Sequence, residues 1–274
     1  MFESISQSIS LAKESWNVLM KDKELLVFPV MSGILSLVVL ASFAGAFFVF
    51  GYAGSETDFS GPLSWVLVFL FYFVTYFFVI FFNTALVGAA LMRLEGKDPT
   101  LGDGLSIAFS KLPGIIAWAL VSATVGLILK SLERGGRRNI LAGIASMILG
   151  VTWTLATFFV IPIMIAENRG PFDSVRRSVE IVKNKWGTAI AGRVGIGLVF
   201  GIMMIVVGLV FFGLIMLVPS LAVIWFLLGL FLIVMIAVVS SALSGVFVAS
   251  MYNYATKGTA SLGFEQSSLQ GAVK

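Results

Sequence analysis

Glu167–Trp186, ENRGPFDSVRRSVEIVKNKW, is a basic amphipathic segment that separates two long apolar runs. Pro171 stands in what would be the first turn of a helix, where a missing N–H costs nothing, and Asp173 lies near the positive end of the helix dipole. Apolar side chains then recur at spacings of three and four residues, which places them in one stripe. They are Phe172, Val175, Val179, Val182 and Trp186. The pattern predicts a helix in the headgroup layer of a membrane, with its basic side chains toward water and anionic lipid. The alternative is a solvated surface helix that packs on other protein.

The composition predicts a membrane protein with several spans. Hydrophobic residues make up 59% of the 274 positions and charged residues 12%. The mean hydropathy of +1.04 excludes an ordinary soluble chain. Six apolar runs are long enough to cross the roughly 30 Å of hydrocarbon in a bilayer. They cover about residues 25–52, 63–94, 113–129, 140–166, 188–218 and 221–254. The predicted fold class is therefore an all-α integral membrane protein with six transmembrane helices.

The distribution of basic residues predicts the orientation in the membrane. Because cytoplasmic loops collect lysine and arginine, the basic flanks of the spans assign both termini to the cytoplasm. The loop 130–139 is the exception, since it would place Lys130, Arg134, Arg137 and Arg138 on the other side. The net charge is only +4 and no separate basic domain exists, so we expect no nucleic-acid partner.

The pattern of the basic segment recurs twice upstream in weaker form. The positions with matching spacing are Ile9, Ala12, Trp16 and Leu19, then Gly102, Leu105, Phe109 and Leu112, then Phe172, Val175, Val179 and Val182. Leu94–Pro99 and Ala166–Pro171 are also alike, because each leaves a span through glutamate and a basic residue toward a proline-led helix. We predict three parallel repeats, each an amphipathic interfacial helix followed by two spans. The repeats cover about 1–97, 98–169 and 170–256 of a single membrane domain, 1–274, and 257–274 form a flexible tail.

Two local features are predicted inside the spans. Pro162 should kink the fourth span, because it lacks a backbone donor and its ring clashes with the preceding turn. In the fifth span, small residues recur as they do on faces where membrane helices approach closely. These residues are Gly192, Gly197, Gly201 and Gly208.

The chain contains no cysteine and no histidine. This removes disulfides, thiol nucleophiles, imidazole bases and nearly every transition-metal site. Acidic residues such as Glu95, Glu167 and Glu180 fall in or beside the interfacial helices, where they act as caps and surface charges. Coupled transport usually needs an ionisable residue at mid-membrane, and none lies there. We therefore predict no enzyme activity, no catalytic residue, no metal site and no cofactor.

Two segments resemble known families. SVRRSVEIVKNKWGTAI, preceded by ENRGPF, resembles the interfacial-helix motif of the glycerophosphodiester phosphodiesterase membrane-domain superfamily. The opening LAKESWNVLMKDKELLVFP resembles an uncharacterised six-span family of bacteria and archaea. The resemblance implies a multi-pass protein of a prokaryotic cell (inner) membrane. The phosphodiesterase chemistry of the superfamily belongs to a separate soluble domain with carboxylates and histidines, so it is not expected here.

These observations favour a non-enzymatic scaffold or accessory subunit that organises lipid or partner proteins at the cytoplasmic membrane surface. The residues predicted to contact anionic headgroups are Arg176, Arg177, Lys183 and Lys185. The expected partners are anionic membrane lipids, with a protein partner or a second copy of the chain in addition. The alternative is a permease component or a channel for lipid or a small apolar molecule. Its polar cavity would be lined by Asn83, Thr154, Ser241 and Asn253.

Overall fold

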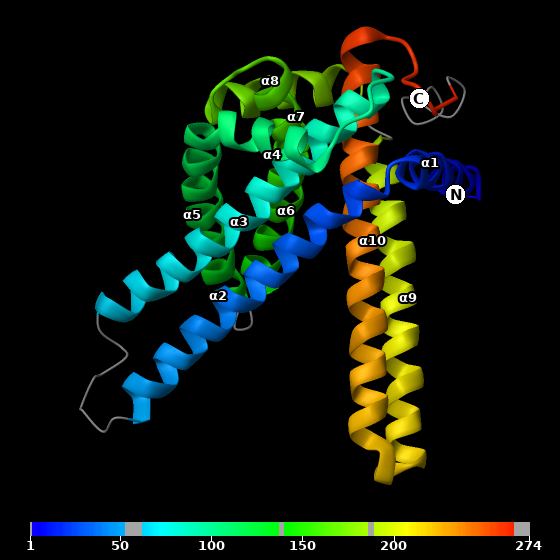
Figure 1. Cartoon of the computed structure of the whole chain (residues 1–274). Helices are drawn as coiled ribbons and strands as arrows, with labels where there is room; N and C mark the ends of the chain where they lie inside the picture. The colour runs from blue at the N-terminus through cyan, green and yellow to red at the C-terminus, as the bar shows by residue number, and fades with distance from the viewer. Residues whose placement is uncertain (1, 53–61, 137–139, 186–188, 266–274) are drawn as a thin grey trace. The chain divides into compact units, whose positions relative to one another are not determined.

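The structure is a computed structural model that describes residues 2–52, 62–136, 140–185 and 189–265 (Figure 1). In these ranges every regular element is helical. The elements are α1 (Phe2–Lys21), η1 (Lys23–Leu26), α2 (Val27–Tyr52), α3 (Pro62–Leu94), α4 (Leu101–Ser110), α5 (Leu112–Gly136), α6 (Ile140–Ala156), α7 (Val160–Ala166), α8 (Pro171–Lys185), α9 (Ala189–Leu217), η2 (Pro219–Leu221) and α10 (Ala222–Lys257).

Six segments of the described chain are long and apolar enough to cross a membrane, which confirms the predicted number of spans. They are Lys23–Gly45, Trp65–Leu94, Leu112–Leu132, Gly143–Ala166, Val199–Leu217 and Pro219–Lys257. The helix of the third span, α5, continues beyond the predicted end of that span at residue 129. It ends at Gly136, so Lys130 belongs to a helix and not to the start of a loop. The chain is a multi-pass membrane protein by the length and hydropathy of these helices.

The chain divides into two compact units, each assembled from segments that are distant in the sequence. Unit 1 contains Met1–Pro29, Ala89–Leu101 and Lys183–Lys274. Unit 2 contains Val30–Gly88 and Gly102–Val182.

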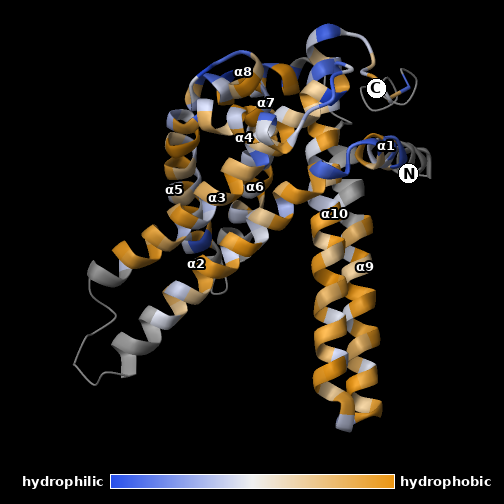
Figure 2. Cartoon of the chain, in the orientation of Figure 1, coloured by the Kyte–Doolittle hydropathy of each residue, from blue (hydrophilic) through white to orange (hydrophobic). Residues whose placement is uncertain are grey.

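The core of unit 1 is the antiparallel pair α9 and α10, against which α1 packs. Figure 2 shows hydrophobic residues along both long helices and hydrophilic residues where α10 leads into the C-terminal segment. The helices α9 and α10 approach closely at Gly229, where an added Cβ would lie 2.9 Å from the side chain of Phe211. Gly197, Gly201 and Gly208 face open space, so they do not make the close helix contact that the sequence predicted. Gly192 lies outside the described side chains.

In unit 2, aromatic side chains join α3, α5 and α6. Trp118 of α5 stacks on Trp153 of α6, with ring centroids 5.6 Å apart. The ammonium of Lys130 lies 5.8 Å from the ring centroid of Tyr72, within the range of a cation–π interaction. Phe81 of α3 meets Phe109 of α4 edge-on at 5.0 Å. Tyr72 and Phe81 of α3 therefore contribute to packing between the helices of unit 2.

The fourth span is broken at residues 157–159, between α6 and α7. Pro162 lies in the first turn of α7, and a proline removes the bond to the carbonyl four residues earlier. The predicted kink is thus confirmed, and the break lies one turn upstream of the proline. The N–H of Phe159 donates instead to Ser178 Oγ of α8, 3.1 Å away. The helix α8 therefore supplies an acceptor for a backbone N–H at the break in the span.

Three helices, α3, α7 and α10, are each followed by a residue with positive φ. Gly96 follows α3 with φ 85°, Asn168 follows α7 with φ 51°, and Gly258 follows α10 with φ 73°. A left-handed residue after a helix allows the last carbonyls to be satisfied while the chain turns away. The Gly258 N–H, for example, donates to the carbonyl of Tyr254 at 3.0 Å. Glycine adopts this conformation without a steric penalty, and asparagine tolerates it better than most residues.

Candidate functional site: basic helix surfaces and a polar cavity

The buried residues of α8 include two serines and an isoleucine. Ser174 and Ser178 are both 0% exposed, and Ile181 is also buried. Of the predicted apolar stripe, Phe172 is 73% exposed, while Val175, Val179 and Val182 are half-buried. The buried line is therefore rotated away from Phe172, because short serine side chains let the α8 backbone approach its neighbours closely. Trp186 lies outside the described residues.

The basic residues of α8 fall into two groups. Arg177 Nε lies 3.4 Å from Glu167 Oε1, and Arg177 Nη1 lies 3.4 Å from Glu180 Oε2. The same Glu167 also accepts Arg169 Nε at 2.7 Å. Arg176 and Lys183 are exposed and form no ion pair with any described residue. The side chain of Lys185 lies outside the described ones.

A second basic surface lies on α1. The described buried residues of α1 are Leu11, Ser15, Val18 and Leu19, and Asp22, just after the helix, is also buried. The exposed residues of α1 include Lys13, Trp16, Met20 and Lys21, and Lys23 of η1 is exposed beside them. An exposed tryptophan beside lysines is typical of a helix at the boundary between headgroups and hydrocarbon. The exposed face at the end of α1 thus mixes apolar and basic groups.

A charged cluster fixes the end of α1 within unit 1. Asp22 is 6% exposed, and its Oδ2 is buried without a hydrogen bond. Arg93 Nη1 pairs with Asp98 Oδ1 at 2.8 Å, and Arg93 Nη2 donates to the carbonyl of Lys21 at 3.4 Å. Glu24 Oε2 accepts the N–H of Leu101 at 2.9 Å. Burial raises the pKa of the Asp22 carboxyl above its ordinary value, although the charge of Arg93 opposes the rise.

The raised pKa of Asp22 predicts a specific pH dependence of stability. A carboxyl that binds its proton more tightly in the folded state stabilises the fold below its unfolded pKa of 3.8. That contribution is lost as the pH rises through the raised folded pKa. The stability advantage of Asp22→Asn over the parent chain should therefore grow as the pH increases from 3.8 toward neutrality. Detergent-denaturation midpoints of both proteins across this range measure the effect, and parallel pH profiles would contradict it.

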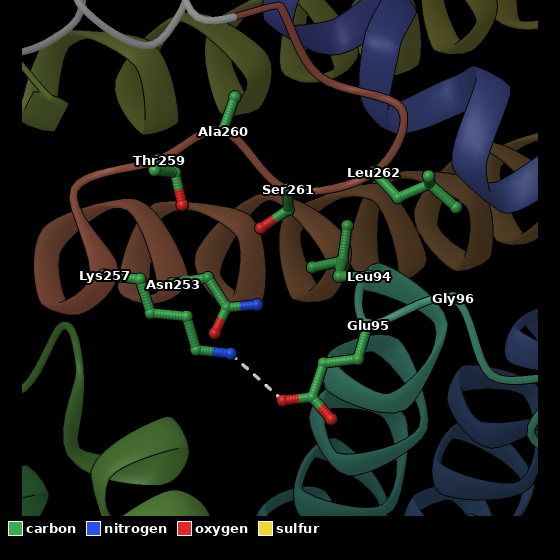
Figure 3. Close-up of a pocket in the computed structure, with 9 residues that line it drawn as sticks. All are labelled: Leu94, Glu95, Gly96, Asn253, Lys257, Thr259, Ala260, Ser261 and Leu262. Atoms are coloured by element: carbon green, nitrogen blue, oxygen red, sulfur yellow. Dashed lines mark hydrogen bonds and ion pairs between the residues drawn. The ribbon is translucent and has the colours of Figure 1, made fainter.

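A cavity of about 470 Å³ lies within unit 1, between the ends of α3 and α10 and the segment that follows α10 (Figure 3). Its lining residues are Leu94, Glu95, Gly96, Asn253, Lys257, Thr259, Ala260, Ser261 and Leu262. The segment folds back over the end of α3, where the Leu262 N–H donates to the Leu94 carbonyl at 3.4 Å. Phe264 is buried at its end. Residues 259–264, the start of the segment predicted as a tail, thus close one side of the cavity.

Two charged residues of the lining, Glu95 and Lys257, form an ion pair, and Lys97 pairs with Glu95 from outside the lining. Lys257 Nζ lies 3.0 Å from Glu95 Oε1, and Lys97 Nζ lies 3.3 Å from Glu95 Oε2. The hydrogen bond from Lys257 lowers the pKa of the Glu95 carboxyl, so it stays ionised over the physiological range. Asn253 is 4% exposed, and its carboxamide points into the cavity beside this pair.

The four residues predicted to line a polar cavity lie in different surroundings. Asn253 lines the cavity just described. Ser241 is exposed on α10, and Asn83 is half-buried on α3. Thr154 is exposed on α6, and its hydroxyl donates to the carbonyl of Gly150 one turn earlier at 2.9 Å. The segment that closes the cavity lacks any hydrophobic periodicity, so sequence reasoning did not indicate Thr259 and Ser261 as lining residues.

Comparison with protein families matches residues 63–263 to a family of unknown function, DUF6159. The chain belongs to this family. The DUF6159 match begins at the start of α3 and ends in the segment that closes the cavity, so it includes α8 and all nine lining residues. No curated protein and no solved structure matches the chain.

Proposed function

We propose that the chain is a non-enzymatic membrane protein that organises anionic lipid at the cytoplasmic membrane surface through α1 and α8. The observation that carries this proposal is that the basic residues of α8 and the segment before it form two groups, those paired with glutamates and those without an ion pair. Arg169 and Arg177 are held by glutamates, whereas Arg176 and Lys183 are exposed without an ion pair among the described residues. An unpaired cation keeps its full charge for a headgroup phosphate, and each is worth about 1 kcal/mol near an anionic surface.

The exposed faces of α8 and α1 also carry apolar groups. Phe172 precedes Arg176 by one helical turn, and Trp16 lies one turn after Lys13. Such pairs of an apolar and a basic side chain suit the membrane interface, where the ring enters the lipid and the cation stays at the phosphates. We place both helices, and both termini, on the cytoplasmic side because basic residues collect there. The partner in this proposal is anionic lipid, and a protein partner or a second copy would dock on the same surface.

We include the three parallel repeats in the proposal. In the spacing alignment of the three interfacial helices, Leu11 corresponds to Gly104 and Ser174, and all three are buried. Ser15 corresponds to Ala108 and Ser178, each 0% exposed. The left-handed residues Gly96, Asn168 and Gly258 lie near the ends of the three predicted repeats. The matching burial and the matching helix ends support the proposal of three repeats. The resemblance to the phosphodiesterase membrane-domain superfamily is consistent with an interfacial position for α8.

Boundary-lipid selectivity tests the proposal. We expect the double variant Arg176→Gln/Lys183→Gln, reconstituted in mixed bilayers, to lose preference for spin-labelled phosphatidylglycerol over phosphatidylcholine. The ratio of the two lipid association constants should fall roughly tenfold relative to the parent protein at low salt. The difference should shrink at higher salt, because salt screens the attraction of the parent's cations to anionic lipid. Electron spin resonance of the labelled lipids, at several salt concentrations, gives the relative association constants.

The matched control is Arg169→Gln/Arg177→Gln, which removes the same charge from side chains that glutamates already hold. It should change lipid selectivity much less, provided that circular dichroism shows the fold retained. Equal losses in both double variants would refute the assignment of the lipid contacts to Arg176 and Lys183. Unchanged selectivity in both would remove the proposed function itself.

A further inference from the structure

The segment that follows α10 forms a strap, residues 259–264, whose path is set by two glycines. Gly258 ends α10 with φ 73°, which lets the chain turn away from the helix. Further along, the Phe264 N–H donates to the Ser261 carbonyl at 3.0 Å and closes a four-residue turn. Gly263 is the third residue of this turn and has φ 91°, the positive value that a type II turn requires at that position. The strap is therefore a defined piece of backbone structure.

Two neighbouring residues at the end of α3 hold the strap and α1. The Leu94 carbonyl accepts the Leu262 N–H at 3.4 Å, where the strap passes over the end of α3 (Figure 3). The preceding residue, Arg93, donates from Nη2 to the Lys21 carbonyl at 3.4 Å, at the end of α1. All of these residues belong to unit 1. The end of α3 therefore brings the strap and the last turn of α1 together.

The strap also touches α1 directly, at Gly263. A Cβ added to Gly263 would lie 2.8 Å from Val18 Cγ2, closer than real Cβ atoms approach their neighbours. Val18 is itself buried, at 4% exposed. Phe264, the next residue of the strap, is 7% exposed, so the turn at Gly263 ends with a buried aromatic side chain. The strap thus packs against a buried residue of a helix at the other end of the chain.

The attachments of the strap are of a kind that opens locally. The hydrogen bond from Leu262 to α3 is long, and the Leu262 side chain is 61% exposed. Segments with few buried apolar side chains open at a small fraction of the free energy of global unfolding. In α10, by contrast, most of residues 242–253 are buried. We therefore expect the strap to open while the pair of α9 and α10 stays folded.

We propose that the strap is a latch for α1, so that residues 259–264 hold the last turns of this helix on unit 1 and release them when the strap detaches. Gly263 acts through its contact with Val18, and Phe264 is the buried anchor. The state of the C-terminal segment thereby sets the mobility of the N-terminal helix. The latch goes beyond the proposed function, because it stands whether or not α1 contacts lipid.

Amide hydrogen exchange of the full chain in a maltoside detergent, read by mass spectrometry, tests the latch. Phe264→Ala removes the buried anchor, so exchange at residues 15–21 of α1 should accelerate about tenfold or more. Gly263→Ala should act in the same direction, because its methyl group meets Val18 and its positive φ is unfavourable for alanine. Exchange at residues 242–253 should stay at the parent rate in both variants. This pattern separates release of α1 from loss of the fold.

The controls change the strap without changing the latch contacts. Leu262→Ala truncates an exposed side chain and should leave exchange at residues 15–21 within about threefold of the parent. In a chain that already carries Val18→Ala, Gly263→Ala should have a much smaller effect, because the backbone strain remains but Cγ2 is gone. Equal acceleration in Leu262→Ala and Phe264→Ala, or parent rates in both latch variants, would overturn the proposal.

If Phe264→Ala fails to fold, a distance measurement replaces it. The chain contains no cysteine, so spin labels on Met20→Cys/Leu262→Cys attach at two exposed positions only, one on α1 and one on the strap. Double electron–electron resonance should give one short, narrow distance distribution in this labelled chain. Adding Gly263→Ala should make the distribution longer and broader. A distribution that Gly263→Ala leaves unchanged would contradict the latch.

Discussion

Replacing Arg93 with glutamine is expected to destabilise unit 1 by about 2–3 kcal/mol, somewhat below the roughly 3–5 kcal/mol lost when a fully buried ion pair is broken. The reason is Asp22, whose buried carboxylate has Arg93 as its main favourable charge. Arg93 is 21% exposed at its side chain, so water replaces part of its effect. The variant also loses the bonds from the guanidinium to Asp98 and to the Lys21 carbonyl.

A double-mutant cycle separates these contributions. Asp22→Asn removes the buried charge, so it should recover a large part of the stability lost in Arg93→Gln. Asp98→Asn, which changes a carboxyl 93% exposed, should recover little. The measurement is the free energy of unfolding in mixed micelles, titrated with dodecyl sulfate and followed by the fluorescence of tryptophan, including Trp16 in unit 1. Additive effects of the two substitutions would show that Arg93 does not compensate Asp22.

The long apolar spans could be predicted from the sequence because each depends only on its own consecutive residues. A run of about 20 apolar residues satisfies its own backbone as a helix and fits the bilayer thickness, whatever its neighbours are. The predicted run 63–94 thus became α3, Pro62–Leu94, and 221–254 became most of α10. The kink of the fourth span was equally local, since Pro162 breaks the preceding turn without help from distant residues.

The buried face of α8, which contains Ser174 and Ser178, could not be predicted from hydrophobic periodicity. Hydrophobic periodicity ranks valine and phenylalanine as buried and serine as exposed, so it selected a stripe that begins at Phe172. The structure buries Ser174 and Ser178, because the contact depends on side-chain size and on a hydrogen bond to Phe159. The partner of that bond is 19 residues away in the sequence and exists only because of the break in the span. The cavity around Asn253 is similar, since the residues that close it carry no periodic signal.

The pair Ser178 and Ser174 provides a sharp test of how α8 is attached. Both serines are 0% exposed and lie one turn apart, yet only Ser178 Oγ accepts a hydrogen bond, from the Phe159 N–H at 3.1 Å. Ser174 Oγ is buried without a hydrogen bond. Ser178→Ala should therefore lower the free energy of unfolding by about 1–3 kcal/mol, because a buried donor loses its acceptor. Ser174→Ala should be neutral or slightly stabilising, since it removes a buried polar atom that has no partner.

Both substitutions remove one hydroxyl from the same helix and leave the same methyl group, so differences in helix propensity and cavity size cancel between them. Dodecyl sulfate titration followed by the fluorescence of tryptophan, including the Trp118–Trp153 stack of unit 2, reports the two stabilities. The local consequence is measurable as well. If Ser178 stabilises the backbone at the break between α6 and α7, amide hydrogen exchange at residues 157–163 should accelerate in Ser178→Ala. It should stay at the parent rate in Ser174→Ala. Equal acceleration in both variants would mean that α8 is held by packing alone, and that the serine bond adds nothing to the attachment of the basic surface.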